Sequence, residues 1–444
     1  MSMARFFLLM LAAAPLLFSL PASAADQQDL PKQLTLSQAL SIALTNNSMI
    51  RSAQDRLEQA AGRTAQTRSK LLPDLEADAR QSYLTINLIG LGIDIPTVPQ
   101  GKTGPFGSMD ARITLTQDLL NIANREAWKS SQSGQQSARL LIDNAREIVV
   151  LDVVAVYLQA LRAKESRDTL AEQTKLATEL YKLTEDRVKQ GVSAPLESNR
   201  ALQQVNTLQQ RQQEAEQSYI AAKLSLAYLL QTRITSDFEL DDSAAYGAEA
   251  TIYRDTALKD ALASRPDYRS MEANVKAAEL QVSSVKAYRF PTVAASFSDG
   301  QSGDSPVHNM NTYRLQGAIS FPIYTSGRIR GQIDEAQGAL REAQAGMDQL
   351  RSQIESEVLT AMSGVEWAIK EVTTSSANVK LSREEVQLAR QRFEKGVTDN
   401  TEVVNAQDRV SRADDARVRA MYTLGLARAN LARATGAAEK TYHK

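Results

Sequence analysis

The side chains that most often carry catalysis or bind transition metals are scarce in this chain. It contains no cysteine, and His308 and His443 are the only histidines among its 444 residues. No disulfide framework is therefore possible, and a soft-metal site has almost no ligands to use. The usual nucleophile–base pairs also lack a base. We expect no enzyme activity, cofactor or metal site; a hydrolase with paired carboxylates is the remaining catalytic alternative, and no constellation of Asp and Glu marks one.

The first residues have the pattern of an export signal. Arg5 gives a short basic region, residues 6–20 form an apolar stretch, and residues 22–24 are a small-x-small cleavage site. We predict a signal peptide over residues 1–24 and a mature chain that begins at Ala25. The apolar stretch is too short to cross a bilayer as a helix. This favours release after export over the alternative of an uncleaved anchor.

The composition of the remaining chain favours long helices. Ala, Leu, Gln, Arg and Glu dominate, and aromatic residues make up only 5%. The formal net charge is −1. A chain so close to neutrality is not expected to attract nucleic acid or anionic lipid strongly.

The sequence contains an internal duplication. Residues 36–73 match residues 254–291 at a shift of 218, and later segments match at a shift of 205. The most telling matches are Pro73 with Pro291, and Gly191-Val192 with Gly396-Val397. We therefore predict a first structural repeat over 25–240 and a second over 241–444. The smaller second shift implies extra residues in the first half, which we place in a surface loop over the Gly/Pro-rich run 90–107.

Proline positions show where long helices can lie. No proline occurs between Pro105 and Pro195 or after Pro322, and proline is expelled from helix interiors. Two continuous helices are therefore predicted, from about 122 to 190 and from about 327 to 394, each a rod of roughly 100 Å. Shorter helices are predicted over 36–70, 196–231, 254–288 and 401–435.

Between the helices the apolar period changes from 3.6 to 2. We predict two strands of about ten residues in each half, in the segments 74–89, 112–116, 293–298 and 312–321. One apolar and one polar face are typical of an outer-membrane barrel; the alternative is a pair of hairpins on a small soluble core. Four strands cannot close a barrel, and lipid does not tolerate an open sheet edge. Several copies must then share one barrel: two would give a small filled barrel, and three an open lumen.

Several motifs, in this order and partly duplicated, resemble the TolC-like outer-membrane efflux proteins over essentially the whole mature chain. They are LTLSQALSIALTNN (34–47), SFPIYTSGRIRGQI (320–333), RVKQGVSAPLESNRA (187–201) and RFEKGVTDNTEVVNAQDRV (392–410). The resemblance implies a homotrimer in the outer membrane of a Gram-negative bacterium. Its 12-stranded β-barrel, four strands from each protomer, would continue as a long α-helical coiled-coil barrel in the periplasm. It also implies a passive exit duct for small molecules such as drugs or toxic compounds, working with a periplasmic adaptor and an inner-membrane pump of the RND, ABC or MFS type.

The resemblance also implies roles for particular residues. The turns at Gly191-Val192 and Gly396-Val397 would be the helix-turn-helix tips at the periplasmic mouth, where an adaptor docks. Glu197 and Glu402 lie six positions after the glycines, where the family often has acidic residues, and three copies would form rings that attract cations. Both are alternatively simple helix starts favoured by the dipole. Phe393 stands where a tyrosine of the family joins the gate bonds. Arg200 and Asn405 replace a second acidic residue.

Two other functional interpretations remain open from the sequence. The same duct could serve type I protein secretion, because specificity lies mainly in the pump. A periplasmic coiled-coil scaffold without a pore would be of a different class, and salt alone would release it from membranes. The sequence does not distinguish the cargo, the pump or the resting state of the mouth.

Overall fold

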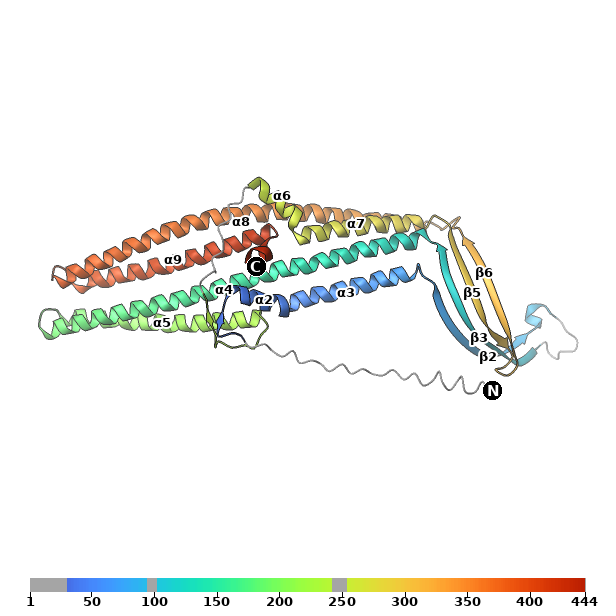
Figure 1. Ribbon diagram of the computed structural model, residues 1–444, viewed down its shortest axis with the longest axis horizontal. Coiled ribbons are helices and arrows are strands. Elements are labelled where there is room, and N and C mark those ends of the chain that lie inside the picture. The colour runs from blue at the N-terminus through green and yellow to red at the C-terminus, as the bar shows by residue number, and fades with distance from the viewer. Residues whose placement is uncertain (1–29, 94–101, 242–253, 444) are drawn as a thin grey trace.

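A computed structural model describes residues 30–93, 102–241 and 254–443. The predicted signal peptide and much of the predicted loop lie outside these residues and stay predictions. The molecule is elongated, with long helices that end in two tips at one end and a β-sheet at the other (Figure 1). Within the described residues no helix is both long and apolar enough to cross a membrane.

Two helices run most of the length of the helical part. They are α4 (Ile122–Lys189, 68 residues) and α8 (Arg328–Glu394, 67 residues). At about 1.5 Å per residue each is a rod of roughly 100 Å. The prediction from proline spacing is confirmed to within a residue at each end. Helices α5 (Pro195–Leu229) and α9 (Asn400–Ala434) return from the tips and pack against α4 and α8.

Each predicted N-terminal helix of a half is in fact two helices. The first half has α2 (Leu36–Asn46) and α3 (Ser48–Ser69), and the second has α6 (Arg254–Ser264) and α7 (Pro266–Ala287). The expectation of single helices over 36–70 and 254–288 was wrong. Asn47 turns extended and caps α3 through its side chain, which accepts from the Met49 amide at 2.8 Å. Arg265 is extended because Pro266 disfavours a helical residue before it.

The sheet has four antiparallel strands in the order β2-β3-β5-β6. The strands are β2 (Asp74–Asn87), β3 (Lys102–Leu120), β5 (Thr292–Gly303) and β6 (Asn309–Ser320). Two strands per half are confirmed, but the first hairpin is longer than predicted. Its second strand begins inside the predicted loop 90–107, because a register irregularity between Leu84 and Ile86 lies beside Pro105 and lets pairing continue past the proline.

The helices lie side by side in a consistent order. Near the tips the order is α8, α9, α4, α5, and near the sheet it is α8, α7, α4, α3 (Figure 1). Helices α8, α3 and α5 are therefore the outermost helices of the protomer. The described elements follow the same order in both halves: two short helices, two strands, a long helix and a returning helix.

The largest core lies at the middle of the rods. There β1 (Gln33–Leu34) pairs in parallel with β4 (Glu239–Leu240), over buried side chains of α2, α4 and α5. The short C-terminal helix α10 (Ala438–Tyr442) docks on α4 at the same level. The Glu147 carboxylate accepts from the backbone amides of Ala438 and Glu439 at 2.8 and 3.2 Å. Arg146 donates from Nε to Glu439 at 2.9 Å.

Candidate functional site: the hairpin tips and the sheet face

The turn between α4 and α5 ends the first hairpin. Gly191 has φ +73°, a conformation that glycine adopts without strain. The amides of Val192 and Gly191 each donate at 2.9 Å to the carbonyls of Arg187 and Val188, which closes the C-terminus of α4. Pro195 then begins α5 with its φ already suited to a first helical position. The local sequence thus specifies both the end of one helix and the start of the next.

The turn between α8 and α9 repeats this geometry. Gly396 has φ +71°, and the Val397 amide donates to the Arg392 carbonyl at 2.9 Å. The Asp399 side chain caps α9 by accepting from the Thr401 amide at 3.1 Å. In the two turns Val192 and Val397 are 62% and 65% exposed, so each tip presents an apolar side chain to its surroundings. Their role in adaptor docking stays a prediction.

The two predicted gate carboxylates lie in the first turns of α5 and α9. Glu402 forms an ion pair with Arg392 of its own hairpin at 3.4 Å. Glu197 has no ion-pair partner in the described part of the chain; its backbone carbonyl accepts from Asn400 Nδ2 at 2.7 Å. The positions match in the duplicated sequence, but the charge at one is balanced locally and the charge at the other is not.

Phe393, the third predicted gate residue, is buried. It is only 1% exposed and packs with Leu180, Ala389, Val403 and Ala406 between the two hairpins. The Arg187 guanidinium lies over its ring, 4.6 Å from the centroid, and donates from Nη1 to its carbonyl oxygen at 2.8 Å. Phe393 therefore joins the hairpins through packing and through its backbone.

Two further contacts cross between the hairpins near the tips. Arg200 donates to the Thr401 hydroxyl at 3.1 Å, and Asn400, which is fully buried, donates to the Glu197 carbonyl. Sequence analysis noted Arg200 only as a departure from the family and did not single out Arg187 or Asn400. The match of Arg187 with Arg392 across the duplication was the available signal. It does not reveal that the two arginines have different partners.

The sheet has one apolar and one polar face, as its register shows. Leu75, Leu115, Phe297 and Leu315 lie directly opposite one another across the four strands. The next row, on the other face, is Glu76, Thr114, Ser298 and Arg314. Leu75 and Leu315 are 67% and 75% exposed. Strands β2 and β6 each have one unpaired edge in the protomer.

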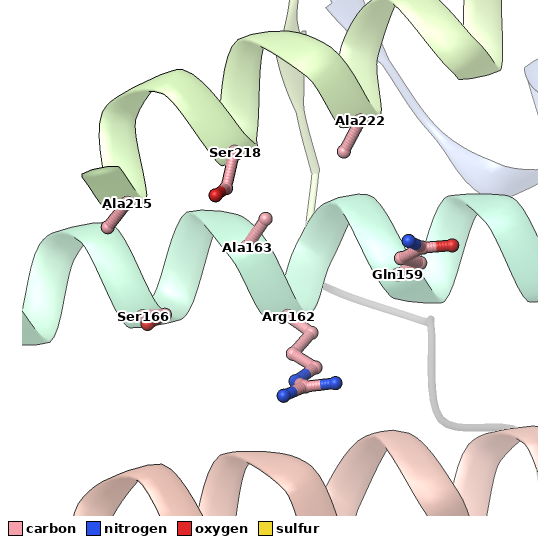
Figure 2. A pocket seen from close by; sticks show the side chains of 7 residues that line it. All are labelled: Gln159, Arg162, Ala163, Ser166, Ala215, Ser218 and Ala222. Atoms are coloured by element: carbon pink, nitrogen blue, oxygen red, sulfur yellow. The ribbon is translucent and has the colours of Figure 1, made fainter. Parts of the chain in front are cut away.

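The helical part has shallow grooves beside α4. One, of about 260 Å³, lies between α4 and α5 and is lined mostly by small side chains. Figure 2 shows Ala163, Ser166 and Ser218 along it, with Arg162 pointing away from α5 toward the neighbouring helix. That helix is α9, since Arg162 lies 5.9 Å from the Tyr422 ring centroid. In the described ranges no three His, Asp or Glu side chains gather as a metal site.

Comparison with known proteins places this architecture in a family. The model of the family described as outer membrane efflux protein matches residues 39–231 and 257–437. The chain is similar to the pyoverdine export outer membrane protein OpmQ of Pseudomonas putida, with 25% identity over 405 residues, 86% of this chain and 82% of that protein. It is also similar to the toluene efflux pump outer membrane protein TtgI of Pseudomonas putida, with 23% identity over 389 residues, 85% of this chain and 79% of that protein.

Solved structures share the fold at low identity. The outer-membrane channel OprN superposes with a TM-score of 0.79 at 21% identity, covering 90% of each chain. The outer membrane protein VceC of Vibrio cholerae gives 0.78 at 19% identity, covering 90% of this chain and 96% of that one. The arrangement of long helices and a four-stranded sheet is therefore that of known channel protomers.

Proposed function

Since the chain belongs to the outer membrane efflux protein family and is an outer-membrane efflux channel with a large periplasmic part, we propose that three copies form one duct. The observation that carries the proposal is the open four-stranded sheet, with an exposed apolar face and unpaired edges at β2 and β6. Four strands cannot close around a lumen, and lipid does not tolerate open edges. Pairing β6 of one copy with β2 of the next keeps every neighbour antiparallel, and three copies of four strands give 12.

The proposed cargo is small molecules. The relatives named above are a pyoverdine export protein and a toluene efflux pump protein, and both names refer to small molecules. The alternatives of protein secretion and of a scaffold without a pore are not favoured by these likenesses. The family and its structural neighbours are channel proteins, and we propose that this chain is likewise a passive conduit that catalyses no reaction and needs no cofactor.

The proposed partners are a periplasmic adaptor and an inner-membrane pump of the RND, ABC or MFS type, which would supply the energy. The tips support adaptor docking because each combines a glycine turn with an exposed valine: Gly191 with Val192, and Gly396 with Val397. Outer-membrane lipid would contact the apolar face of the sheet.

The proposed gate lies at the same tips. The Arg187 contact with Phe393, the Asn400 contact with Glu197 and the Arg200 contact with Thr401 join the two hairpins of one protomer. While these contacts hold, the hairpins cannot separate. Glu197 and Glu402 would face cations that enter the mouth, with Glu197 carrying the charge that is not balanced locally.

Reconstitution tests the proposal directly. The purified mature protein is inserted into planar bilayers, and its mass in detergent is measured by light scattering. We expect discrete single-channel conductance and the mass of three chains. A single-chain mass, together with no conductance from protein shown to be inserted, would refute the proposed duct.

A further inference from the structure

One long edge of α8 presents a regular stripe to solvent. Its members recur every seven residues at Trp367, Thr374, Leu381 and Leu388. Trp367, Leu381 and Leu388 are 57%, 63% and 61% exposed, although the adjoining face of α8, with Ala368, is buried against α9. A seven-residue repeat of large side chains is the pattern of a helix that packs along a second helix. Within the described residues of one chain this stripe has no such helix.

The duplicated sequence shows what packs at the equivalent stripe of the first half. At the shift of 205, Trp367, Thr374 and Leu388 correspond to Arg162, Thr169 and Leu183 of α4. All three α4 residues lie against α9. The contacts are Arg162 over the Tyr422 ring, Thr169 beside Ser411 and Asp415 in a groove of about 330 Å³, and Leu183 in the cluster with Val403. The stripe on α4 is thus covered by α9, and the one on α8 is left open.

The same shift identifies the helix that would cover α8. Helix α9 corresponds to α5, and its residues Tyr422 and Ala429, which belong to the packing on α4, correspond to Gln217 and Leu224. Helix α5 is an outermost helix of the protomer (Figure 1). It exposes Ile220, Leu224 and Tyr228 at one end of this face, by 39%, 37% and 74%. Its lower part there is rich in Gln and Asn.

We propose that the Trp367–Leu388 edge of α8 is a docking surface for α5 of a second copy of this chain, in the register that α9 adopts on α4. Trp367 then lies against Gln217 and Ile220 of the next copy. Both contacts are antiparallel, since α4 and α8 run toward the tips whereas α5 and α9 run away from them. The inference rests on the proposed three-chain duct, and it specifies which helices meet in it and in what register.

The docking surface is consistent with ring closure. Each copy offers the α8 edge on one side and the α5 edge on the other, so successive copies meet head to tail. Head-to-tail contacts make a closed ring when the rotation per copy divides a full turn. The α4–α9 contact inside the chain and the α8–α5 contact between chains would then alternate around the tunnel.

Because the chain has no cysteine, site-specific cross-linking tests the register without background. In the chain Arg417 of α9 pairs with Glu165 of α4 at 2.5 Å, and the equivalent positions are Gln212 of α5 and Lys370 of α8. The variant Gln212→Cys/Lys370→Cys, treated with a short bis-maleimide, should give covalent dimers and trimers on denaturing gels. The matched control is Asn199→Cys/Lys370→Cys, whose α5 site lies roughly 20 Å lower along the helix and should cross-link at least tenfold less.

Light scattering on the same samples separates the two ideas. A three-chain mass with no cross-link, or with equal cross-linking in the control, would overturn the docking register and leave the duct in place. A single-chain mass would overturn both. Cross-linking in the predicted pair alone, in a sample of three-chain mass, supports the inference.

Tryptophan fluorescence gives a second, independent measurement. The chain has two tryptophans, so Trp128→Phe leaves Trp367 as the only reporter. In the assembled channel Trp367 should be shielded, with iodide quenching reduced at least threefold from that of free N-acetyltryptophanamide. Quenching as strong as that of the free compound, in protein of three-chain mass, would overturn the placement of Trp367 at the subunit contact.

Discussion

Arg187 of the first hairpin holds Phe393 of the second by a hydrogen bond to its carbonyl oxygen at 2.8 Å and by stacking on its ring. Arg392, which occupies the matching position in the second hairpin, instead pairs with Glu402. The duplicated hairpins therefore differ at the point where they touch, and only the first one reaches across.

Removing this contact should favour an open mouth. Arg187→Ala loses a hydrogen bond and a cation–π contact, which together contribute about 1–2 kcal/mol, so the open probability in planar bilayers should rise several-fold. Arg187→Lys should behave similarly, since lysine keeps the charge but lacks the planar fork. Lys189→Ala, which changes a 64% exposed side chain two residues away, is the control. Open probabilities of Arg187→Ala and Lys189→Ala that do not differ would contradict the latch.

The two gate carboxylates should contribute unequally to ion selectivity. Glu402 is paired with Arg392 at 3.4 Å and Glu197 has no ion pair within the described residues, so Glu197→Gln should lower cation preference more than Glu402→Gln. The measurement is the reversal potential of each variant in a KCl gradient. If Glu402→Gln has the larger effect, or if neither changes the potential, the assignment of Glu197 to the lumen is wrong.

Arg265 should be among the most sensitive residues of the helical part. It is 2% exposed and donates to Asp267 at 2.6 Å and to Glu357 at 2.5 Å. Removing one partner of a buried ion pair costs about 3–5 kcal/mol, so Arg265→Ala should lower the urea midpoint strongly. Asn47→Ala, at the matching helix break, removes only a cap worth about 1 kcal/mol. Equal midpoints for the two variants would show that the ion pairs around Arg265 contribute little.

The attachment of α10 should weaken in acid. The hydrogen bond and charge of Arg146 hold the pKa of the Glu439 carboxyl below its ordinary value. A carboxyl with a lowered pKa stabilises the folded state above its unfolded pKa of about 4.5, and this contribution is lost as the pH falls below that value. Glu439→Gln should therefore lower the urea midpoint at pH 7, by an amount equivalent to about 1 kcal/mol, and have little effect at pH 3.

The control for the α10 prediction is a surface ion pair of ordinary exposure. Lys276 and Glu279 are 62% and 45% exposed, so Glu279→Gln should leave the midpoint nearly unchanged at both values of pH. A Glu439→Gln effect that is the same at pH 3 and pH 7 would mean that the charge of Glu439 is not what stabilises α10.

Neighbouring residues of β6 should respond oppositely to the same substitution. Leu315 lies in the apolar row of the sheet and Gln316 points to the other face. An arginine facing lipid costs about 2–4 kcal/mol near the middle of the bilayer, so Leu315→Arg should reduce the amount of assembled channel in outer membranes. Gln316→Arg should be tolerated. Equal yields on non-denaturing gels would mean that the apolar row does not face lipid.

Much of the fold was predictable because its strongest signals are local. Proline is excluded from helix interiors, so its absence defined α4 and α8, and alternation of apolar residues located the strands. The helix breaks were missed although their signals were present: Asn47 is a good N-cap, and Pro266 restricts Arg265. The start of β3 was missed because Pro105 reads as a loop residue until a register irregularity in its partner is seen.

The contacts at the tips were not predictable in the same way. Arg187 and Phe393 are 206 residues apart, and nothing near either residue indicates that they meet. Phe393 was expected at a gate by resemblance, whereas the structure buries it in the packing between hairpins. The stripe on α8 was likewise missed, because a sequence shows that Trp367 is apolar but not which neighbour covers it.

The internal duplication also changes how many collisions an assembly needs. A ring of six half-repeats made from separate chains would require six partners to meet, with a yield that falls steeply on dilution. Here the α4–α9 contact joins two half-repeats of one polypeptide, where the linking chain gives them a high effective concentration. Only three encounters then remain, so the assembled form can persist at the low copy number of a dilute envelope protein.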